Sequence, residues 1–220
     1  MTALRLGLTG GIVSGKSTVS HWLAGRGAVI LDADAVSRSL TGKDGAALAL
    51  IEKVFGSAAL NADGAMNRNF MRQLVYSDPS ARQCLESILH PLVQQTLHDQ
   101  WRAVPQIVSC VVFDVPLLVE NYAQWRPQID LLLVVDCPQK IQIQHTATRS
   151  HLKNTEVEQI MHAQASRAQR LAVADWVLDN SGSLALRLVS GSVQEDDRLL
   201  VVRDDVGADM LRDSPGENLT

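Results

Sequence analysis

Residues 10–17 read GGIVSGKS and contain the residue types that bind a polyphosphate. They fit the pattern G-x-x-x-x-G-K-[ST], with Gly10, Gly15, Lys16 and Ser17 in the four fixed positions. In such a phosphate loop, backbone N–H groups and the start of the following helix attract phosphate oxygens. Lys16 would reach the β- and γ-phosphates, and the Ser17 hydroxyl would coordinate Mg²⁺. The residues predicted to bind ATP here are Gly11, Ile12, Val13, Ser14, Gly15, Lys16, Ser17 and Thr18.

Val13 is the one residue that fits this loop poorly. Many phosphate loops have glycine at this position, in a backbone conformation that L-residues avoid. Placing an L-residue in left-handed geometry costs roughly 1–2 kcal/mol, and more when the side chain is β-branched. A cost of this size corresponds to a loss of about 5–30-fold in affinity. We therefore expect Val13 to weaken nucleotide binding without abolishing it.

The elements around the motif have the order that a phosphate loop requires. Short apolar segments rich in Val, Ile and Leu predict buried strands, and a helical pattern over 16–25 follows the loop. Strands separated by helices indicate an α/β fold, here the fold of phosphate-loop nucleoside triphosphatases and nucleotide kinases, with a parallel five-stranded sheet flanked by helices. The predicted strands are Leu4–Thr9, Ala28–Leu31, Ile107–Asp114, Ile129–Asp136 and Asp175–Leu178.

A long helical stretch interrupts this alternation between residues 45 and 103. Pro79 and Pro91 must start, break or kink helices within it. An insertion at this point would lie at the carboxyl edge of the sheet, where ligands of such folds bind. We therefore divide the chain into a core (1–40, 106–137 and 172–200), a helical substrate domain (41–105), a helical lid (138–171) and a polar, acidic, partly disordered tail (201–220).

The composition excludes several classes of protein. The chain has 220 residues, is 46% hydrophobic and carries a net charge of −4, so the strongly basic face of a nucleic-acid binder is not expected. Its three cysteines form no C-x-x-C pair, and its apolar runs are too short to span a bilayer. We expect a cytoplasmic protein without membrane or nucleic-acid partners, and a monomer, with a small homo-oligomer as the alternative.

The segment VILDADAVSR places two carboxylates after the second predicted strand. Asp32 and Asp34 are two residues apart, so on a strand both would face the phosphate loop. A kinase that acts on a hydroxyl uses a carboxylate to accept its proton. Because the N-K-x-D pattern of guanine-nucleotide binders is absent, we favour a small-molecule kinase, in which Asp34 or, as the less favoured choice, Asp32 would be the base. The alternative is that Asp34 caps a helix that begins near Ala35.

The chain also resembles the dephospho-coenzyme A kinases over roughly residues 6–184. The matching segments occur in the family's order: LTGGIVSGKSTV, VILDADAVSR, LNADGAMNRNFMRQLVYSDP, LESILHPLV, DVPLLVEN, VVDCP and AQASRAQRLAVADWVLDNSGSL. HPL, VPLL-x-E and AD-x-V-x-DN together are distinctive among phosphate-loop kinases. The resemblance implies transfer of the γ-phosphoryl of ATP, with Mg²⁺, to the ribose 3′-hydroxyl of dephospho-CoA.

The resemblance also assigns roles to individual residues. Asp34 matches the family's proposed base, and Arg68, His90, Pro116 and Leu117 lie in segments that match its substrate site. The alternative for Arg68 is a solvated arginine at a helix end without contact to substrate. The alternative for His90 is that it caps a kinked helix before Pro91. For Glu120 we favour a structural role in the loop after Pro116.

Asp114 ends an apolar strand, where it would hold Mg²⁺ through water; an ordinary strand-end turn residue is the alternative. The resemblance also implies that the lid brings arginines to the transferred phosphoryl group. Arg149 is the leading candidate, followed by Arg167 and Arg170. Surface arginines on amphipathic helices are the alternative for all three.

At one lid position this chain departs from the family. His145 stands where an arginine is common, four residues before Arg149 and therefore on the same helix face. Histidine is mostly neutral at pH 7, so the lid has less positive charge. Two other interpretations therefore remain: another phosphate-loop kinase for a nucleotide or small metabolite, and a weakened nucleotide-binding homologue marked by Val13 and His145.

Overall fold

A computed structural model describes residues 3–138, 141–142, 164–180, 187–190 and 199–201. The chain forms two compact units, one from residues 1–30 and 105–220 and the other from residues 31–104. The first unit is therefore built from two separate stretches of the chain, and the second is inserted between them. Each unit is described below by itself.

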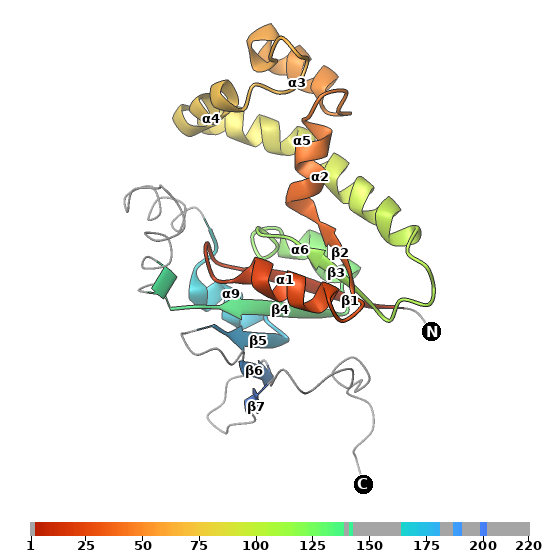
Figure 1. Cartoon of the computed structure of the whole chain (residues 1–220). Helices are drawn as coiled ribbons and strands as arrows, with labels where there is room; N and C mark the ends of the chain where they lie inside the picture. Colours follow the sequence, from red (N-terminus) through yellow and green to blue (C-terminus); the bar gives the residue numbers. More distant parts are fainter. Residues whose placement is uncertain (1–2, 139–140, 143–163, 181–186, 191–198, 202–220) are drawn as a thin grey trace. The chain divides into compact units, whose positions relative to one another are not determined.

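A twisted β-sheet organises the first unit (Figure 1). Its strands lie in the order β2-β3-β1-β4-β5-β6-β7. β1 pairs in parallel with β3 on one side and with β4 on the other, and β4 pairs in parallel with β5. The strands are β1 (Leu4–Gly10), β2 (Val29–Asp32), β3 (Cys110–Asp114), β4 (Leu131–Asp136), β5 (Trp176–Asp179), β6 (Arg187–Ser190) and β7 (Leu199–Val201).

The parallel five-stranded sheet flanked by helices is confirmed. Two antiparallel strands, β6 and β7, extend it beyond β5 and were not predicted from the sequence. The third strand begins at Cys110 rather than at the predicted Ile107. Ile107 is 91% exposed in the loop before it, so its apolar side chain is not part of the core.

Helix α1 (Lys16–Ala24) lies across the sheet in front of β1 (Figure 1). Its buried face, from Val19 to Leu23, packs with apolar side chains of β1, β3 and β4 in one hydrophobic cluster. Because this cluster fixes the helix against the sheet, the phosphate loop between β1 and α1 has two rigid ends. The unit also contains α6 (Tyr122–Trp125), the 3₁₀-helix η2 (Arg126–Gln128) and α9 (Arg167–Val173), and α9 packs against β4.

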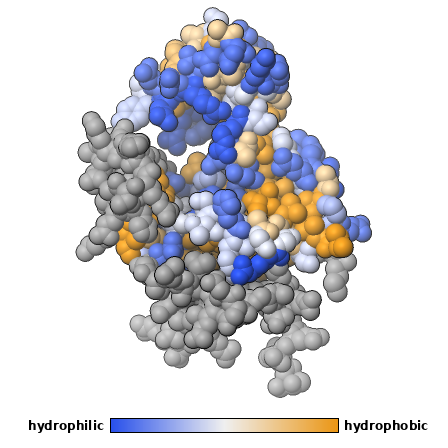
Figure 2. Space-filling view, in the orientation of Figure 1, coloured by the Kyte–Doolittle hydropathy of each residue, from blue (hydrophilic) through white to orange (hydrophobic). Residues whose placement is uncertain are grey.

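The second unit is helical. Its elements are α2 (Ala33–Leu40), α3 (Leu48–Phe55), η1 (Ser57–Ala59), α4 (Arg68–Ser77) and α5 (Pro79–Arg102). Helix α5 is the common support, because α2, α3 and α4 all pack against it. In Figure 2 the visible surface of this unit is mostly hydrophilic, as expected for helices that bury only one face.

The helix ends in this unit follow from local sequence. Asp78 accepts a hydrogen bond from the Ser80 N–H, and Pro79 occupies the first turn of α5, where its missing N–H costs nothing. Pro91 lies inside the same helix, which continues through it to Arg102. The expectation that a proline must start, break or kink a helix therefore holds for Pro79 as a start, whereas Pro91 does not end the helix. Among the helices that the structure describes, none combines the length and apolar character needed to span a bilayer.

Candidate active site

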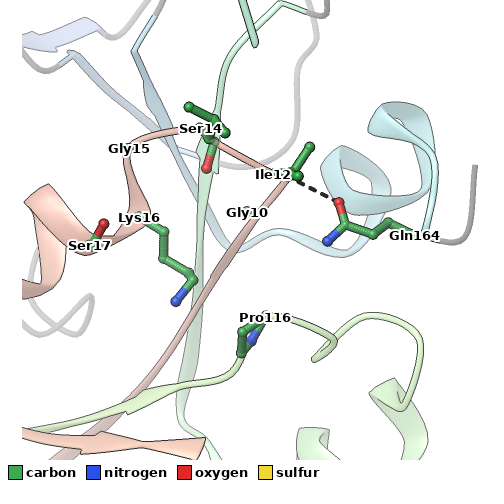
Figure 3. A pocket seen from close by; sticks show the side chains of 10 residues that line it. Gly10, Ile12, Ser14, Gly15, Lys16, Ser17, Pro116 and Gln164 are labelled. Atoms are coloured by element: carbon green, nitrogen blue, oxygen red, sulfur yellow. Dashed lines mark hydrogen bonds between the residues drawn. The ribbon is translucent and has the colours of Figure 1, made fainter. Parts of the chain in front are cut away.

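The phosphate loop surrounds a cavity of about 230 Å³ at the end of β1 (Figure 3). The whole loop lines this cavity, together with Pro116 from the segment after β3 and Gln164 from the segment before α9. Figure 3 shows Lys16 and Gln164 on different sides of the loop and Pro116 across from it. Among the loop residues predicted to bind ATP, Thr18 is outside this lining; it lies in the first turn of α1.

The loop holds two residues in left-handed backbone geometry. Val13 has φ of 55° and Gly15, the N-cap of α1, has φ of 95°. The expected misfit of valine is therefore present: a β-branched residue occupies a conformation that favours glycine. Ser14, between them, is 1% exposed, and its N–H donates to the Gly11 carbonyl at 3.1 Å. The loop thus keeps the shape of its pattern despite the strain at Val13.

Lys16 and Asp114 form an ion pair beside this cavity. Asp114 ends β3 and is aligned with Leu8 of β1, so the parallel pairing of the two strands brings the carboxylate to the phosphate loop. It is only 5% exposed, and the Lys16 ammonium is its positive partner. The lysine predicted for phosphate and the carboxylate predicted for Mg²⁺ therefore lie together, because the sheet aligns the two strand ends.

Two arginines of α9 lie on this side of the unit. Arg167 donates from Nε and Nη2 to the buried Asp136 carboxylate, with Nη2 to Oδ2 at 2.7 Å, and these hydrogen bonds raise the pKa of Arg167. Arg170 is 9% exposed and donates to the Ala165 carbonyl. Its burial lowers the pKa of its guanidinium. A Cβ built on Gly11 would come within 3.0 Å of the Arg170 Nη2, so the loop and this arginine are neighbours.

Sequence reasoning did not single out two side chains that hold the loop. Gln164 accepts a hydrogen bond from the Ile12 N–H at 3.1 Å, and Asn180 donates from Nδ2 to the Ser14 carbonyl at 2.8 Å. Both are amide side chains far from the loop in sequence, in segments without a local pattern that predicts such contacts. Both lie in AQASRAQRLAVADWVLDNSGSL, one of the segments that carry the family resemblance, but the resemblance assigned no role to either residue.

The loop after β3 is anchored as predicted for Glu120, whose Oε1 accepts from the Ala165 N–H at 2.6 Å. Pro116 lines the cavity and its carbonyl accepts from the Thr9 hydroxyl at 3.0 Å. The Leu117 carbonyl accepts from Asn121 Nδ2 at 3.2 Å. The main chain from Pro116 to Asn121 is therefore fixed at several points.

The other predicted residues belong to the helical unit. Asp34 is exposed in the first turn of α2 and is not on a strand, so the expectation that it shares a strand face with Asp32 is wrong. Asp32 accepts from the Ala35 N–H at 2.9 Å and is the cap that was considered for Asp34. The strand ends one residue later than predicted, and Asp32 then caps α2 at once.

Arg68 begins α4, where it is exposed and donates to the Thr41 hydroxyl at 3.1 Å, and His90 lies half-buried in α5 just before Pro91. The unit thus holds Asp34, Arg68 and His90 on three different helices. Arg149 and His145 lie outside the described residues, as do most of the predicted lid and almost all of the predicted tail.

The sequence profile of dephospho-CoA kinases matches residues 4–185, which include the phosphate loop and the helical unit. The chain belongs to the dephospho-CoA kinase family. A dephospho-CoA kinase from Albidiferax ferrireducens is 50% identical over 190 residues, which cover 84% of this chain and 89% of that protein. One from Bordetella avium is 48% identical over 180 residues, covering 82% of this chain and 83% of the relative.

Solved structures agree with the fold described above. A Thermus thermophilus protein of known crystal structure superposes with a TM-score of 0.71 at 30% identity, covering 84% of this chain and 92% of its own. A dephospho-CoA kinase from Campylobacter jejuni has a TM-score of 0.61 at 21% identity, with 82% and 89% coverage, and supports the fold alone. The predicted family and fold are therefore confirmed.

Proposed function

We propose that this chain carries out its family's reaction, the ATP-dependent phosphorylation of the ribose 3′-hydroxyl of dephospho-CoA to give coenzyme A, at the cavity of the phosphate loop. The observation that carries this proposal is the Lys16–Asp114 pair beside a phosphate-loop cavity in a member of that family. The family match supports the overall reaction, and the roles of individual residues below are our own assignments.

The triphosphate of ATP would occupy the cavity, with its oxygens accepting from the backbone N–H groups of residues 11–18. Lys16 would leave Asp114 for the β- and γ-phosphates, because a phosphate group carries more negative charge than one carboxylate. The transferred phosphoryl group would then be surrounded by fixed N–H dipoles and one ammonium group. Such preorganised charge accounts for much of catalysis in phosphoryl transfer.

The oxygen atoms near Lys16 fit Mg²⁺. Ser17 lines the cavity, and the buried Asp114 carboxylate is paired with Lys16, which also lines it. A hydroxyl and a carboxylate are the hard oxygen donors that Mg²⁺ prefers. Ser17 would hold the ion directly and Asp114 through water. When bound, Mg²⁺ neutralises charge on the β- and γ-phosphates.

The residues that we assign to binding of the acceptor are Asp34, Arg68 and His90 in the helical unit and, separately, Pro116 and Leu117 in the first unit. Asp34 would accept the proton of the 3′-hydroxyl, a role that suits an exposed carboxylate at a helix start. Arg68 is exposed and hydrogen-bonded through one amino group, which leaves the rest of its guanidinium for substrate phosphates. His90 would orient the substrate.

Arginines would supply the remaining positive charge. We assign Arg149 to the transferred phosphoryl group and Arg167 to the nucleotide. Arg167 is bound to Asp136 through Nε and Nη2, yet its side chain stays 56% exposed, so its remaining amino group can reach a ligand. We further propose that the protein is a cytoplasmic monomer, which size-exclusion chromatography with light scattering would test. The cysteines that the structure describes are all free, as in a reducing compartment.

Asp34→Asn tests the assignment of the base. The amide keeps the size of the side chain but accepts no proton, so we expect kcat to fall by about 10²–10⁴-fold. Nucleotide affinity should stay unchanged. The measurement is a coupled ADP-release assay with dephospho-CoA, and Asp32→Asn is the matched control with little effect on kcat. Turnover of Asp34→Asn near that of the unchanged protein would contradict this role.

A substrate panel separates the reaction from its alternatives. Only the leading proposal predicts a strong preference for dephospho-CoA over nucleosides, nucleoside monophosphates and small alcohols. The strained Val13 is the observation that favours a weakened nucleotide binder. Tight ADP binding without turnover of any acceptor would support that alternative instead.

A further inference from the structure

Asn180 connects the end of β5 to the middle of the phosphate loop. Its Nδ2 donates to the Ser14 carbonyl at 2.8 Å, and its backbone N–H donates to the Asp136 carbonyl at 2.8 Å. The second bond ties Asn180 to the end of β4, so a rigid sheet edge positions the side chain. A Cβ on Gly15 would collide with the same Nδ2, which shows how closely the amide lies against the loop.

The bond to Ser14 fixes the direction of one peptide group. In a trans peptide the C=O and the N–H point in opposite directions. Because Asn180 holds the Ser14 carbonyl, the Gly15 N–H of the same peptide must point to the opposite side. This N–H bonds to no other residue in the described part of the chain, and Gly15 lines the cavity. Rotation of this peptide would turn a carbonyl oxygen, in place of the N–H, toward an anionic ligand.

Backbone strain at Val13 favours rotation of the Ser14–Gly15 peptide group. Val13 at φ 55° and Gly15 at φ 95° flank the anchored peptide, and the valine prefers other conformations. A strained backbone conformation persists where contacts with the surrounding structure hold it in place. The buried Ser14 hydroxyl has no hydrogen-bond partner among the described residues, so it does not supply this restraint. The Asn180 amide does, from a strand end 166 residues away in sequence.

We propose that Asn180 is a positioning residue that holds the Val13–Gly15 segment in its phosphate-binding conformation and so compensates for the valine. This inference rests on the proposed function, because it assumes that a triphosphate binds in the cavity. Asn180, the residue that follows β5, would thereby position a loop that is 166 residues away in the sequence.

The direct test is ADP affinity by isothermal titration calorimetry for Asn180→Ala and Asn180→Asp. Each variant loses the donor to Ser14, so we expect the Kd for ADP and the KM for ATP to rise by about five- to tenfold. The KM for dephospho-CoA should not change. Asn180→Asp keeps the shape of the side chain and serves if the alanine variant folds poorly. ADP affinities equal to that of the unchanged protein would overturn the proposal.

Two comparisons separate positioning from a general loss of stability. Gln128→Ala removes another bond from a side-chain amide to a backbone carbonyl, 2.9 Å long and within η2 and α6, and should leave the Kd for ADP unchanged. In a Val13→Gly background, the loss caused by Asn180→Ala should shrink to about twofold, because glycine adopts the left-handed conformation without the anchor. An equal loss in both backgrounds would overturn the proposal.

The proposed function and this inference fail in different ways. If the unchanged protein binds ADP and phosphorylates dephospho-CoA, but substitutions at Asn180 do not change the Kd for ADP, only the inference fails. If the unchanged protein does not bind ADP, both fail together.

Discussion

At the scale of the residue, Val13 places a β-branched side chain at φ 55° in the loop that we assign to the triphosphate. The fold tolerates this strain because both ends of the loop are fixed, by β1 and by α1. The strain raises the free energy of the loop conformation that binds phosphate, relative to other conformations of the loop. It should therefore weaken nucleotide binding and leave the chemical step unchanged. Val13 is thus expected to tune affinity for ATP.

Val13→Gly should therefore tighten the binding of ATP and ADP. Relief of about 1–2 kcal/mol of strain corresponds to about 5–30-fold in Kd, and the Asn180 anchor makes the lower end of this range the expected result. Calorimetry with ADP measures it. Asp44→Gly is the matched control, since Asp44 also has positive φ, 62°, but does not line the cavity. Weaker binding by Val13→Gly would contradict this account.

The Lys16–Asp114 pair makes a separate prediction about Mg²⁺. In Asp114→Asn the Lys16 ammonium loses its competing partner, so ADP should bind about tenfold more tightly when EDTA removes divalent ions. With Mg²⁺ present, kcat should fall because the proposed water-mediated ligand is lost. ADP titrations with and without Mg²⁺ measure both effects. Unchanged ADP affinity in EDTA would mean that the ion pair does not compete with phosphate.

The pattern of the phosphate loop is local, so the sequence indicated the loop residues that line the cavity; of the loop residues that it indicated, only Thr18 lies outside the lining. It did not predict Asn180 or Gln164, which reach the loop from distant segments through contacts that only the fold creates. The prediction for Asp34 failed for another reason. The two-residue spacing of Asp32 and Asp34 predicts a shared face only on a strand, and α2 already begins at Ala33.

At the scale of the element, helix α5 carries an exposed proline in its interior. Pro91 has no N–H for the Ser87 carbonyl, four residues earlier, and its ring crowds the same turn. The helix nevertheless continues to Arg102, because α2, α3 and α4 pack along it. Tertiary packing therefore outweighs a local signal that would otherwise end the helix at this point.

Pro91→Ala should restore the missing helical bond and raise the free energy of unfolding by about 1–3 kcal/mol. Urea titration followed by circular dichroism measures this change. Pro79→Ala is the control, because Pro79 occupies the first turn, where no helical bond is missing, and its replacement should have little effect. A lower stability of Pro91→Ala would show that the packing of α5 depends on the proline.

At the scale of the whole molecule, the first unit is formed by two stretches of the chain, and the helical unit lies between them in the sequence. Its separate stretches are linked where Arg5 of β1 meets Asp130 before β4, with Nη2 to Oδ1 at 2.5 Å and the Arg5 N–H to Oδ2 at 2.8 Å. The sequence indicates a helical interruption of the strand pattern between residues 45 and 103, and the helical unit of the structure comprises residues 31–104. The antiparallel strands β6 and β7 lie on either side of a polar stretch of sequence, residues 191–198, and were not predicted.

Hydrogen bonds from Arg5 lower the pKa of Asp130 from its ordinary value of 3.8. A lowered native pKa means that the pair stabilises the fold above the unfolded pKa, and that this contribution is lost as pH falls through the native pKa. Both side chains are partly exposed, so Asp130→Asn should cost at most about 1 kcal/mol at pH 7. Urea titrations at several pH values should show this difference shrinking below about pH 4. A difference that grows in acid would contradict the assignment.

The most direct test of the central claim is the product that the purified protein forms from ATP, Mg²⁺ and dephospho-CoA. We predict one new ribose 3′-phosphomonoester for each ADP released, observed by ³¹P nuclear magnetic resonance and mass spectrometry. Lys16→Ala should lose this activity, because it removes the ammonium group at the phosphate loop. A folded protein that binds both substrates and forms no 3′-phosphate would contradict the account.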